Sequence, residues 1–389
     1  MFVPLLLYPL YRWSAALYGR EAGLAAVILA SFCPNLLAHA SLATNDFAAA
    51  ATMIAAAYGF WRWLEEPSLR AAVLAAAAAG LALAAKFSAL VYLPPVFLLC
   101  LLVGPRPAAP ARSLLAQAAV FFGVVYAVLG ATYGFRWLPV AYLEGAVGVW
   151  RHAQRGHPGF LMGEWRQHGW WYYFPVALGL KSTVPMLALA MGAVCLLGAR
   201  RQWRLAGPAA GAAAILAAAM SSSVNIGVRH VLPLFPFLAV VGSAAVAQGG
   251  RRWVRALAIL ALLWHAGESL AAHPDYLAYF NQLARGREQE LLGDSNLDWG
   301  QDLARLARYL ERHRIEQIHL NCFGTTSPAA VGIRHATEFG PADRPRGWVA
   351  ISLGRLQAGG RDYEWLTRRA PHARIGKSIL LYHVPASDF

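Results

Sequence analysis

The stretch Asn35-Leu-Leu-Ala-His39-Ala-Ser-Leu-Ala-Thr44-Asn45-Asp46-Phe47 joins two long apolar runs and places a carboxylate at their junction. The runs cover residues 22–43 and 47–64. A charged side chain between two apolar segments is costly unless it lies at a membrane interface or in a water-filled cavity, so Asp46 is a candidate functional residue. The alternative is that Thr44, Asn45 and Asp46 only cap the following helix, because Asn and Asp are favoured N-cap residues.

Apolar stretches occupy most of the first 270 residues, and ten of them are long enough, or nearly so, to cross ~30 Å of hydrocarbon as helices. With 58% hydrophobic and 14% charged residues, the composition fits a multi-spanning membrane protein with a soluble appendage. We therefore expect an α-helical polytopic membrane protein with about ten transmembrane helices in residues 1–270 and a small external α/β domain in residues 271–389. The predicted helices lie near 2–17, 22–43, 46–63, 69–85, 88–103, 112–131, 171–198, 204–220, 228–247 and 252–270.

The short loops between these stretches alternate in charge. The loops on one side of the predicted helices contain most of the arginines, whereas the short turns on the other side contain only Lys86 and Arg229 as basic residues. The positive-inside rule places the arginine-rich side in the cytoplasm and therefore Asp46, Lys86, Arg229 and the C-terminal domain outside. Membrane orientation thus explains the net charge of +14 better than nucleic-acid binding does. The arginines on the cytoplasmic side are Arg20, Arg62, Arg70, Arg106, Arg112, Arg200, Arg201, Arg204, Arg251, Arg252 and Arg255.

Two groups of basic residues are candidates for binding phosphate. The chain has only three lysines, and two of them, Lys86 and Lys181, lie at or inside predicted membrane segments. A compact ammonium suits a phosphate oxygen there, although chance and snorkelling of the side chain would explain the positions equally well. Arg229 and His230 follow the polar run 221–225 at the start of a predicted helix, where free N–H groups favour an anion. The alternative is a capped helix with an interfacial arginine.

The segment 132–170 is rich in aromatic and basic residues, and we expect it to form an external loop. Tryptophan and tyrosine beside a bilayer form an interfacial belt. The same residue types suit sugar recognition, because flat aromatic faces pack on sugar C–H surfaces while residues such as His157 and Glu164 bind hydroxyls. A metal role for His157 or His168 lacks a second ligand with diagnostic spacing. The four cysteines form no CxxC or Cys/His pattern, so neither disulfides nor a zinc site is expected.

Hydropathy falls sharply after His273-Pro274, where the external domain is expected to begin. Its opening run, Asp294-Ser-Asn296-Leu-Asp298-Trp299-Gly-Gln301-Asp302, is dense in hydrogen-bonding side chains. A calcium site is disfavoured because the twelve-position pattern of the EF-hand is absent, and an Asx-turn with a helix cap is the alternative. Predicted strands cover 318–323, 348–353 and 378–384, and predicted helices cover 299–312 and 363–369, the first with Leu303, Leu306 and Leu310 on one face.

These segments together resemble glycosyltransferase family 39 of the GT-C superfamily, the class of protein O-mannosyltransferases and aminoarabinose transferases. The resemblance covers nearly the whole chain, and the two runs Asn225-Ile-Gly-Val-Arg-His230 and Asp294 to Asp302 are its most specific parts. The other matching runs are Pro34 to His39 with Thr44-Asn45-Asp46, Gly80 to Ser88, Gly156-His157-Pro158 through Gly163-Glu164, Lys181 to Pro185, and Tyr279-Phe280-Asn281.

The resemblance implies a membrane glycosyltransferase that takes mannose or a similar sugar from a polyprenyl-phosphate carrier. The acceptor would be a protein, a glycan or a lipid at the external face of the bacterial inner membrane. By resemblance, Asp46 is the catalytic acid near the sugar, and no cofactor, divalent metal or nucleic-acid partner is expected. The carrier phosphate is assigned to Arg229, Lys181, Lys86 and His230, and the sugar or acceptor to His39, Asn45, His157, Glu164, Asn296, Asp298, Trp299 and Gln301.

One departure from the family pattern concerns the start of the chain. Relatives begin with a further transmembrane helix and a large external loop that carries the acid usually assigned as catalytic base, whereas this sequence opens in the helix that follows. We expect either a chain that lacks its N-terminal part, which then binds the carrier weakly and transfers no sugar, or a relative that has lost the base. The alternative function is a membrane protein that binds or flips lipid-linked sugar without transferring it, although no internal repeat supports a flippase.

Overall fold

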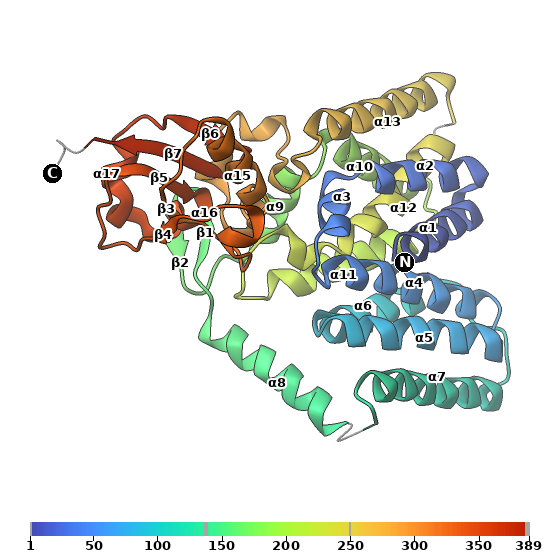
Figure 1. The fold of residues 1–389 in the computed structure, drawn as a ribbon. Coiled ribbons are helices and arrows are strands. Elements are labelled where there is room, and N and C mark those ends of the chain that lie inside the picture. Colours follow the sequence, from blue (N-terminus) through green and yellow to red (C-terminus); the bar gives the residue numbers. More distant parts are fainter. Residues whose placement is uncertain (1, 136–138, 249, 386–389) are drawn as a thin grey trace.

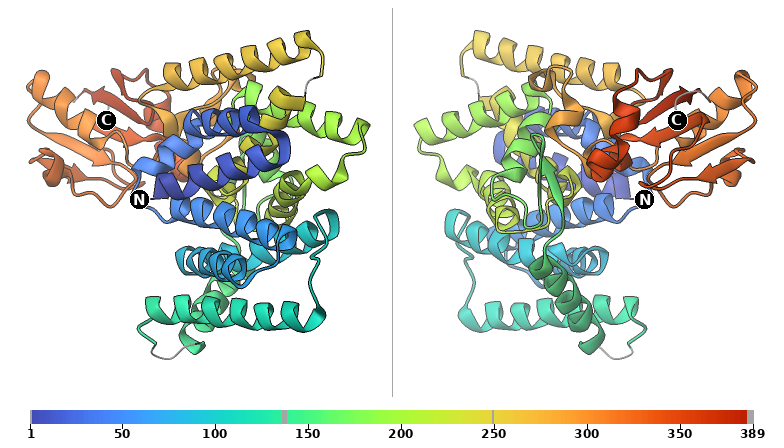
Figure 2. Two further views of the ribbon diagram at one scale, coloured as in Figure 1. Left: turned by 90° about the vertical axis from the view of Figure 1, so that its right-hand side faces the viewer. Right: turned by 90° about the vertical axis from the view of Figure 1, so that its left-hand side faces the viewer.

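The computed structural model describes residues 2–135, 139–248 and 250–385, and it consists of a helical body followed by a small sheet domain (Figure 1). The sheet domain lies at one end of the body in all three views (Figures 1 and 2). Each of the ten predicted apolar stretches contains a helix. The helices are α1 (Phe2–Tyr18), α2 (Arg20–Ser31), α3 (Pro34–Ser41), α4 (Asp46–Glu65), α5 (Leu69–Ala85), α6 (Ser88–Val103), α7 (Ala111–Thr132), α9 (Tyr173–Lys181), α10 (Val184–Ala199), α11 (Gly207–Met220), α12 (Leu234–Gln248) and α13 (Arg252–Ala272).

Two predicted stretches are broken rather than continuous. Residues 22–43 fold as α2 and α3, which meet at 59°, and residues 171–198 fold as α9 and α10, which meet at 116°. In both cases a proline, Pro34 or Pro185, stands in the first turn of the second helix, where its missing N–H costs nothing. Within the described residues, two helices, α7 and α13, are long and apolar enough to span a membrane, or up to four if each bent pair is one span. The number of ten spans therefore stays a prediction.

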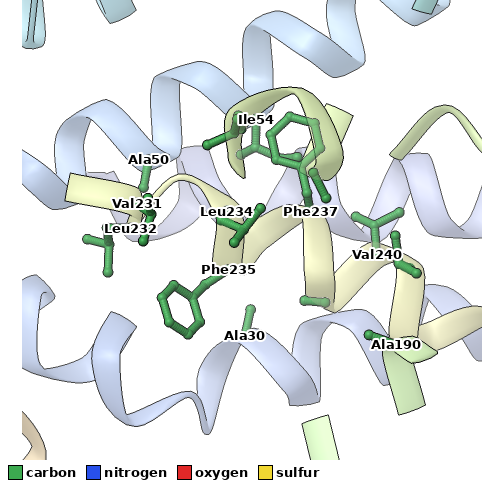
Figure 3. Close-up of a cluster of buried hydrophobic side chains, with 14 of the residues drawn as sticks. Ala30, Ala50, Ile54, Ala190, Val231, Leu232, Leu234, Phe235, Phe237 and Val240 are labelled. Atoms are coloured by element: carbon green, nitrogen blue, oxygen red, sulfur yellow. The ribbon is translucent and has the colours of Figure 1, made fainter. Parts of the chain in front are cut away.

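Helix α12 forms the centre of the helical body (Figure 3). Its residues from Leu234 to Val246 are buried on every side except Leu238, as expected for a helix that is apolar all round. Phe235 and Phe237 are fully buried and pack among side chains of α2, α4 and α10, including Ala30, Ile54 and Ala190. This core fixes the start of α12, and with it the preceding residues 225–231, against the rest of the body.

The segment 132–170 was predicted as a loop, but it contains a helix and a hairpin; its residues 136–138, including Arg136 and Trp137, lie outside the described part. Helix α8 (Val140–Arg155) is followed by the antiparallel strands β1 (Gly159–Leu161) and β2 (Glu164–Arg166). The apolar residues Leu143, Val147 and Trp150 recur at helical spacing and remain exposed. Figure 1 shows α8 apart from the other helices, between α7 and the hairpin.

The C-terminal domain is built on a five-stranded mixed sheet in the order β4-β3-β5-β7-β6. Strand β3 runs parallel to both β4 and β5, and β7 runs antiparallel to β5 and β6. The three predicted strands are confirmed as β3 (Ile318–Asn321), β5 (Gly347–Ser352) and β7 (Ile379–Val384). The short strands β4 (Ala336–Glu338) and β6 (Ala373–Ile375) were missed, and the helices are α14 (Glu288–Leu291), α15 (Leu303–Arg312), α16 (Leu353–Gly359) and α17 (Glu364–Thr367).

Helix α15 buries Leu303, Leu306 and Leu310 against the sheet, as predicted. It begins at Leu303 rather than at Trp299, because the four residues before it form hydrogen-bonded turns. Asp298 Oδ1 accepts a hydrogen bond from Gly300 N at 3.1 Å, and Gly300 has φ +78°, a conformation that favours glycine. The predicted helix start is therefore wrong by four residues, and the Asx-turn alternative is confirmed for Asp298.

Candidate active site

Asp46 is the first residue of α4, and its side chain is only 1% exposed. Its Oδ1 accepts a hydrogen bond from Lys86 Nζ at 2.5 Å, and its Oδ2 lies 4.0 Å from Arg229 Nη1. Oδ2 has no hydrogen-bond partner among the described residues. The structure thus brings together one carboxylate and two cations from three segments that are far apart in the sequence.

The local structure explains why Asp46 meets Lys86. Asn45 Nδ2 donates a hydrogen bond to Ala85 O at 2.9 Å, which ties the start of α4 to the end of α5. Lys86 follows directly as the C-cap of α5, with an extended backbone. Neither Asn45 nor Asp46 caps α4 with its side chain in the described structure, so the capping alternative is wrong. Burial lowers the pKa of Lys86, and the Asp46 carboxylate opposes that shift by favouring the ammonium.

Arg229 lies in a short 3-10 helix, Val228–Val231, before α12. Its guanidinium carbon is 4.0 Å from the centroid of the Trp299 ring, within the range of a cation–π interaction. Its Nε has no hydrogen-bond partner among the described residues, and its Nη1 is too far from Asp46 for a hydrogen bond. The guanidinium therefore retains unused donors beside a buried carboxylate.

The segment before Arg229 is locked to the opening run of the C-terminal domain. Ser295 Oγ donates to Ile226 O at 2.5 Å, and Asn296 Oδ1 accepts from Val228 N at 3.0 Å. Gly227 makes this approach possible, since it has φ +127° and a Cβ there would lie 2.2 Å from Ser295 Oγ. The two most specific runs of the sequence are therefore in direct contact.

The other predicted residues of that run mostly hold its backbone. Asn296 is fully buried and donates to Tyr173 OH and to Gly293 O, both at 2.9 Å, while Gln301 bonds the backbone of Trp299 and Leu297. Asp298 accepts from Gly300 N and Gly354 N, and burial raises its pKa. Trp299 is the one that reaches Arg229. A sugar-binding role for Asn296, Asp298 and Gln301 stays a prediction.

Lys181 is fully buried, and its ammonium is already bound. Nζ donates to Leu277 O and to Asn296 O, each at 2.7 Å, and lies 4.4 Å from the centroid of the Phe280 ring. These contacts attach the end of α9 to the two segments that lead into the C-terminal domain. Sequence reasoning assigned Lys181 to the carrier phosphate, and that role remains a prediction beside the structural role seen here.

The remaining predicted residues lie around this centre at different depths. His39, on α3, is 3% exposed, interacts electrostatically with Asp46, and has no hydrogen-bond partner on Nδ1 among the described residues. His230 stacks on Phe174 with ring centroids 6.4 Å apart. His157 lies beside Val224 in an isolated β-bridge, whereas Glu164 is exposed and pairs with Arg166 at 3.0 Å.

Two features of the site were missed by sequence reasoning. The Asp46–Lys86 ion pair had a signal, since these are two of the few charges at the turns opposite the arginine-rich loops. Asp294 gave a weaker signal, as one of the acids in the run 294–302. It is partly buried and interacts with Arg229 and His157, and burial raises its pKa. No group of three His, Cys, Asp or Glu side chains is arranged to hold a metal ion in the described parts of the chain.

Residues 2–131, which include Asp46 and Lys86, match the sequence model of the dolichyl-phosphate-mannose-protein mannosyltransferases. The resemblance to this family is confirmed. Among solved structures, ArnT from Cupriavidus metallidurans bound to undecaprenyl phosphate is similar over 97% of this chain and 82% of that chain, with a TM-score of 0.52 and 14% identity. The apo state of ArnT is similar over 97% of this chain and 81% of that chain, with a TM-score of 0.49 and 14% identity. No curated protein matches the chain by sequence.

At 14% identity, the similarity to ArnT establishes the fold and no residue role. The chain therefore has the fold of ArnT, which in this chain is mostly helical and ends in a small sheet domain. The mannosyltransferase family model covers the segment that carries Asp46 and Lys86 but stops before Arg229.

Proposed function

We propose that this chain is a membrane glycosyltransferase that moves a sugar, mannose or a similar one, from a polyprenyl-phosphate carrier to an acceptor. The observation that carries the proposal is the Asp46 carboxylate, buried between Lys86 and Arg229 where α4, α5 and the start of α12 meet. One acid and two cations are the groups that this reaction needs. The match to mannosyltransferases and the fold of ArnT, whose crystal structure holds undecaprenyl phosphate, support the assignment.

The chemistry divides between the acid and the cations. In the reaction, an acceptor hydroxyl oxygen bonds to the anomeric carbon, and the bond from that carbon to the carrier phosphate oxygen breaks. Asp46 takes the hydroxyl proton or orients the hydroxyl. The phosphate leaves with the electron pair, and Lys86 and Arg229 stabilise its added charge. For this, Lys86 exchanges its contact with Asp46 for one with the phosphate.

The other assigned residues complete the proposed site. Lys181 and His230 are retained as members of the carrier site. His39, Asn45, His157, Glu164, Asn296, Asp298, Trp299 and Gln301 are retained for the sugar or acceptor. Of these, His39 interacts electrostatically with Asp46, and Trp299 contacts Arg229. We further propose that the site opens on the external face of a bacterial inner membrane, because the arginine-rich loops lie at the opposite ends of the helices.

The decisive experiment measures transfer of radiolabelled sugar from polyprenyl-phosphate donors. It uses membranes from cells that express the gene at its own chromosomal locus, with wild type compared with Asp46→Asn. We expect label to leave the lipid fraction in wild type and to stay there in the variant, while both proteins bind undecaprenyl phosphate. If wild type binds the carrier and moves no label, the chain binds or flips lipid-linked sugar and is no transferase.

A further inference from the structure

A polar cavity lies within the C-terminal domain, on elements that contribute no side chain to the Asp46 centre. Its volume is about 150 Å³, which is room for about five water molecules. The cavity is bounded by the end of β3, the end of β4 and the start of α16. Its lining includes Asn321, Phe323, Thr326, Glu338, Phe339 and Arg355.

The position of this cavity follows from the topology of the sheet. Strands β3, β4 and β5 are parallel, so their carboxyl ends meet at one edge. After β3 the chain continues to β4 on one side of it, whereas after β5 it continues to β6 on the other side of the sheet. Open sheets bind ligands in the crevice outside the carboxyl ends of their strands, where successive connections diverge in this way. The cavity lies in that crevice.

The cavity is lined by one acidic and one basic side chain. Glu338 and Arg355 both line it, and neither has an ion-pair or hydrogen-bond partner among the described residues. The Arg355 guanidinium carbon lies 5.7 Å from the centroid of the Phe323 ring. A guanidinium only donates hydrogen bonds and a carboxylate only accepts them. A ligand that carries adjacent hydroxyl groups satisfies both, and a net charge on the ligand would be repelled by one of the two.

Two phenylalanine rings complete the lining and supply apolar contact beside the polar groups. Asn321 is held by a hydrogen bond from its Nδ2 to Tyr363 OH at 2.7 Å, and Phe323 N donates to Ser352 Oγ at 3.0 Å, so the end of β3 is fixed. A rigid concave site with aromatic walls and a few oriented polar groups is typical of small-ligand pockets. Cys322 also lines the cavity, and burial raises the pKa of its thiol, which makes this thiol a weak nucleophile.

From these observations we infer that the cavity is a binding site for one neutral, hydroxyl-rich sugar unit, held between Glu338 and Arg355 against Phe323. This site is separate from the carrier site, because it is formed by β3, β4 and α16. It is also close to it, since the Phe323 and Trp299 rings are 5.1 Å apart and Trp299 stacks with Arg229. The inference concerns binding, and it holds whether or not the chain transfers sugar.

The test is saturation-transfer NMR on the full chain in lipid nanodiscs, which avoids detergents with sugar headgroups. The probes are the methyl pyranosides of mannose, glucose and galactose, with glucuronate and glucose 1-phosphate as charged comparisons. We expect at least one neutral pyranoside to bind, and Glu338→Gln and Arg355→Gln each to weaken it at least tenfold. Thr326→Trp, which fills the cavity from an exposed position, is expected to abolish binding.

Matched controls separate this pocket from the rest of the chain. Glu364→Gln and Arg374→Gln remove exposed charges of the same domain that do not line the cavity, and they are expected to leave affinity within twofold. Asp46→Asn and Arg229→Gln show whether the pyranoside instead occupies the site around Asp46. The inference is overturned if wild type binds no neutral pyranoside, if a charged sugar binds more tightly, or if only the Asp46 and Arg229 variants lose binding.

Discussion

The guanidinium of Arg229 stacks on the ring of Trp299, so a cation of the helical body is positioned by a side chain of the C-terminal domain. The same arginine is the second cation beside Asp46, at 4.0 Å from its Oδ2. The side chains of Ser295 and Asn296 form hydrogen bonds with the backbone of Ile226 and Val228, and these bonds hold the two parts together. The C-terminal domain is therefore one wall of the candidate active site, and changes in it are expected to affect carrier binding.

Trp299→Leu tests this relationship directly. A cation–π contact of this kind is worth about 1 kcal/mol, so its loss is expected to weaken binding of undecaprenyl phosphate about fivefold. Trp299→Phe keeps an aromatic face and is expected to recover part of the affinity. Native mass spectrometry of the chain with added lipid gives the measurement. Trp253→Leu, at an exposed tryptophan on α13, is the control; equal losses at Trp253 and Trp299 would contradict a specific role for the stacking.

The Asp46–Lys86 pair predicts a strong energetic coupling. Lys86→Met leaves a buried carboxylate with only a distant cation, and removing one member of a buried pair costs about 3 kcal/mol of unfolding free energy. The double variant Asp46→Asn/Lys86→Met is expected to be more stable than Lys86→Met alone, because the unpaired charge is gone. Unfolding in lipid-containing micelles measures the free energy of unfolding of the single and the double variant.

The exposed ion pair Glu364–Arg368 serves as the reference for the coupling energy between Asp46 and Lys86, measured in the same way from single and double variants. Its members are 54% and 74% exposed, so their coupling should be below about 1 kcal/mol. A coupling at Asp46–Lys86 no larger than at this surface pair would show that the buried contact is loose and solvated.

Arg229 should carry much of the affinity for the carrier phosphate. Arg229→Gln is expected to weaken undecaprenyl phosphate binding at least tenfold. Arg229→Lys is expected to restore only part of it, because a lysine lacks the planar fork that grips two phosphate oxygens. Arg255→Gln, which removes an exposed cation paired with Glu21, controls for general charge effects. Normal binding by both Arg229 variants would reduce Arg229 to a structural contact of Trp299.

Hydropathy located the apolar helices of the body, because apolar composition and burial coincide along whole turns, but it missed α8, which is not apolar throughout and was predicted as a loop. It did not separate α2 from α3 or α9 from α10, since an apolar run stays apolar across a bend, although Pro34 and Pro185 marked the positions. Strands β4 and β6 have three residues each, too few for an alternating pattern.

The candidate site was only partly predictable for a different reason. The residue types at Asp46, Lys86 and Arg229 stood out, because charges are rare at those turns. Which charge pairs with which depends on tertiary packing, and no sequence spacing encodes the contact between Asn45 and Ala85 that brings Lys86 to Asp46. Lys181 illustrates the opposite case. Its type suggested a phosphate ligand, yet the carbonyl groups of Leu277 and Asn296 reach its ammonium in the fold.

Transfer should not depend on a divalent metal ion. Lys86 and Arg229 supply the two positive charges that a metal would otherwise bring to the leaving phosphate. Addition of EDTA is therefore expected to leave the rate of sugar transfer unchanged, within experimental error, in membranes that contain the protein. A loss of activity that Mg²⁺ or Mn²⁺ restores would show that a metal takes part and that the two cations are insufficient.

The last prediction concerns the side of the membrane on which the site lies. Since Trp299 stacks with Arg229, the C-terminal domain and the Asp46 centre must lie on the same side of the bilayer. By the positive-inside rule, the arginine-rich loops at the other ends of the helices predict that this side is external. Protease added to inverted inner-membrane vesicles, which expose the cytoplasmic face, is expected to spare residues 271–389 and to cut them only after detergent is added. Cleavage of the domain in intact inverted vesicles would place the site in the cytoplasm, and it would remove the charge-based argument for an external glycosyltransferase.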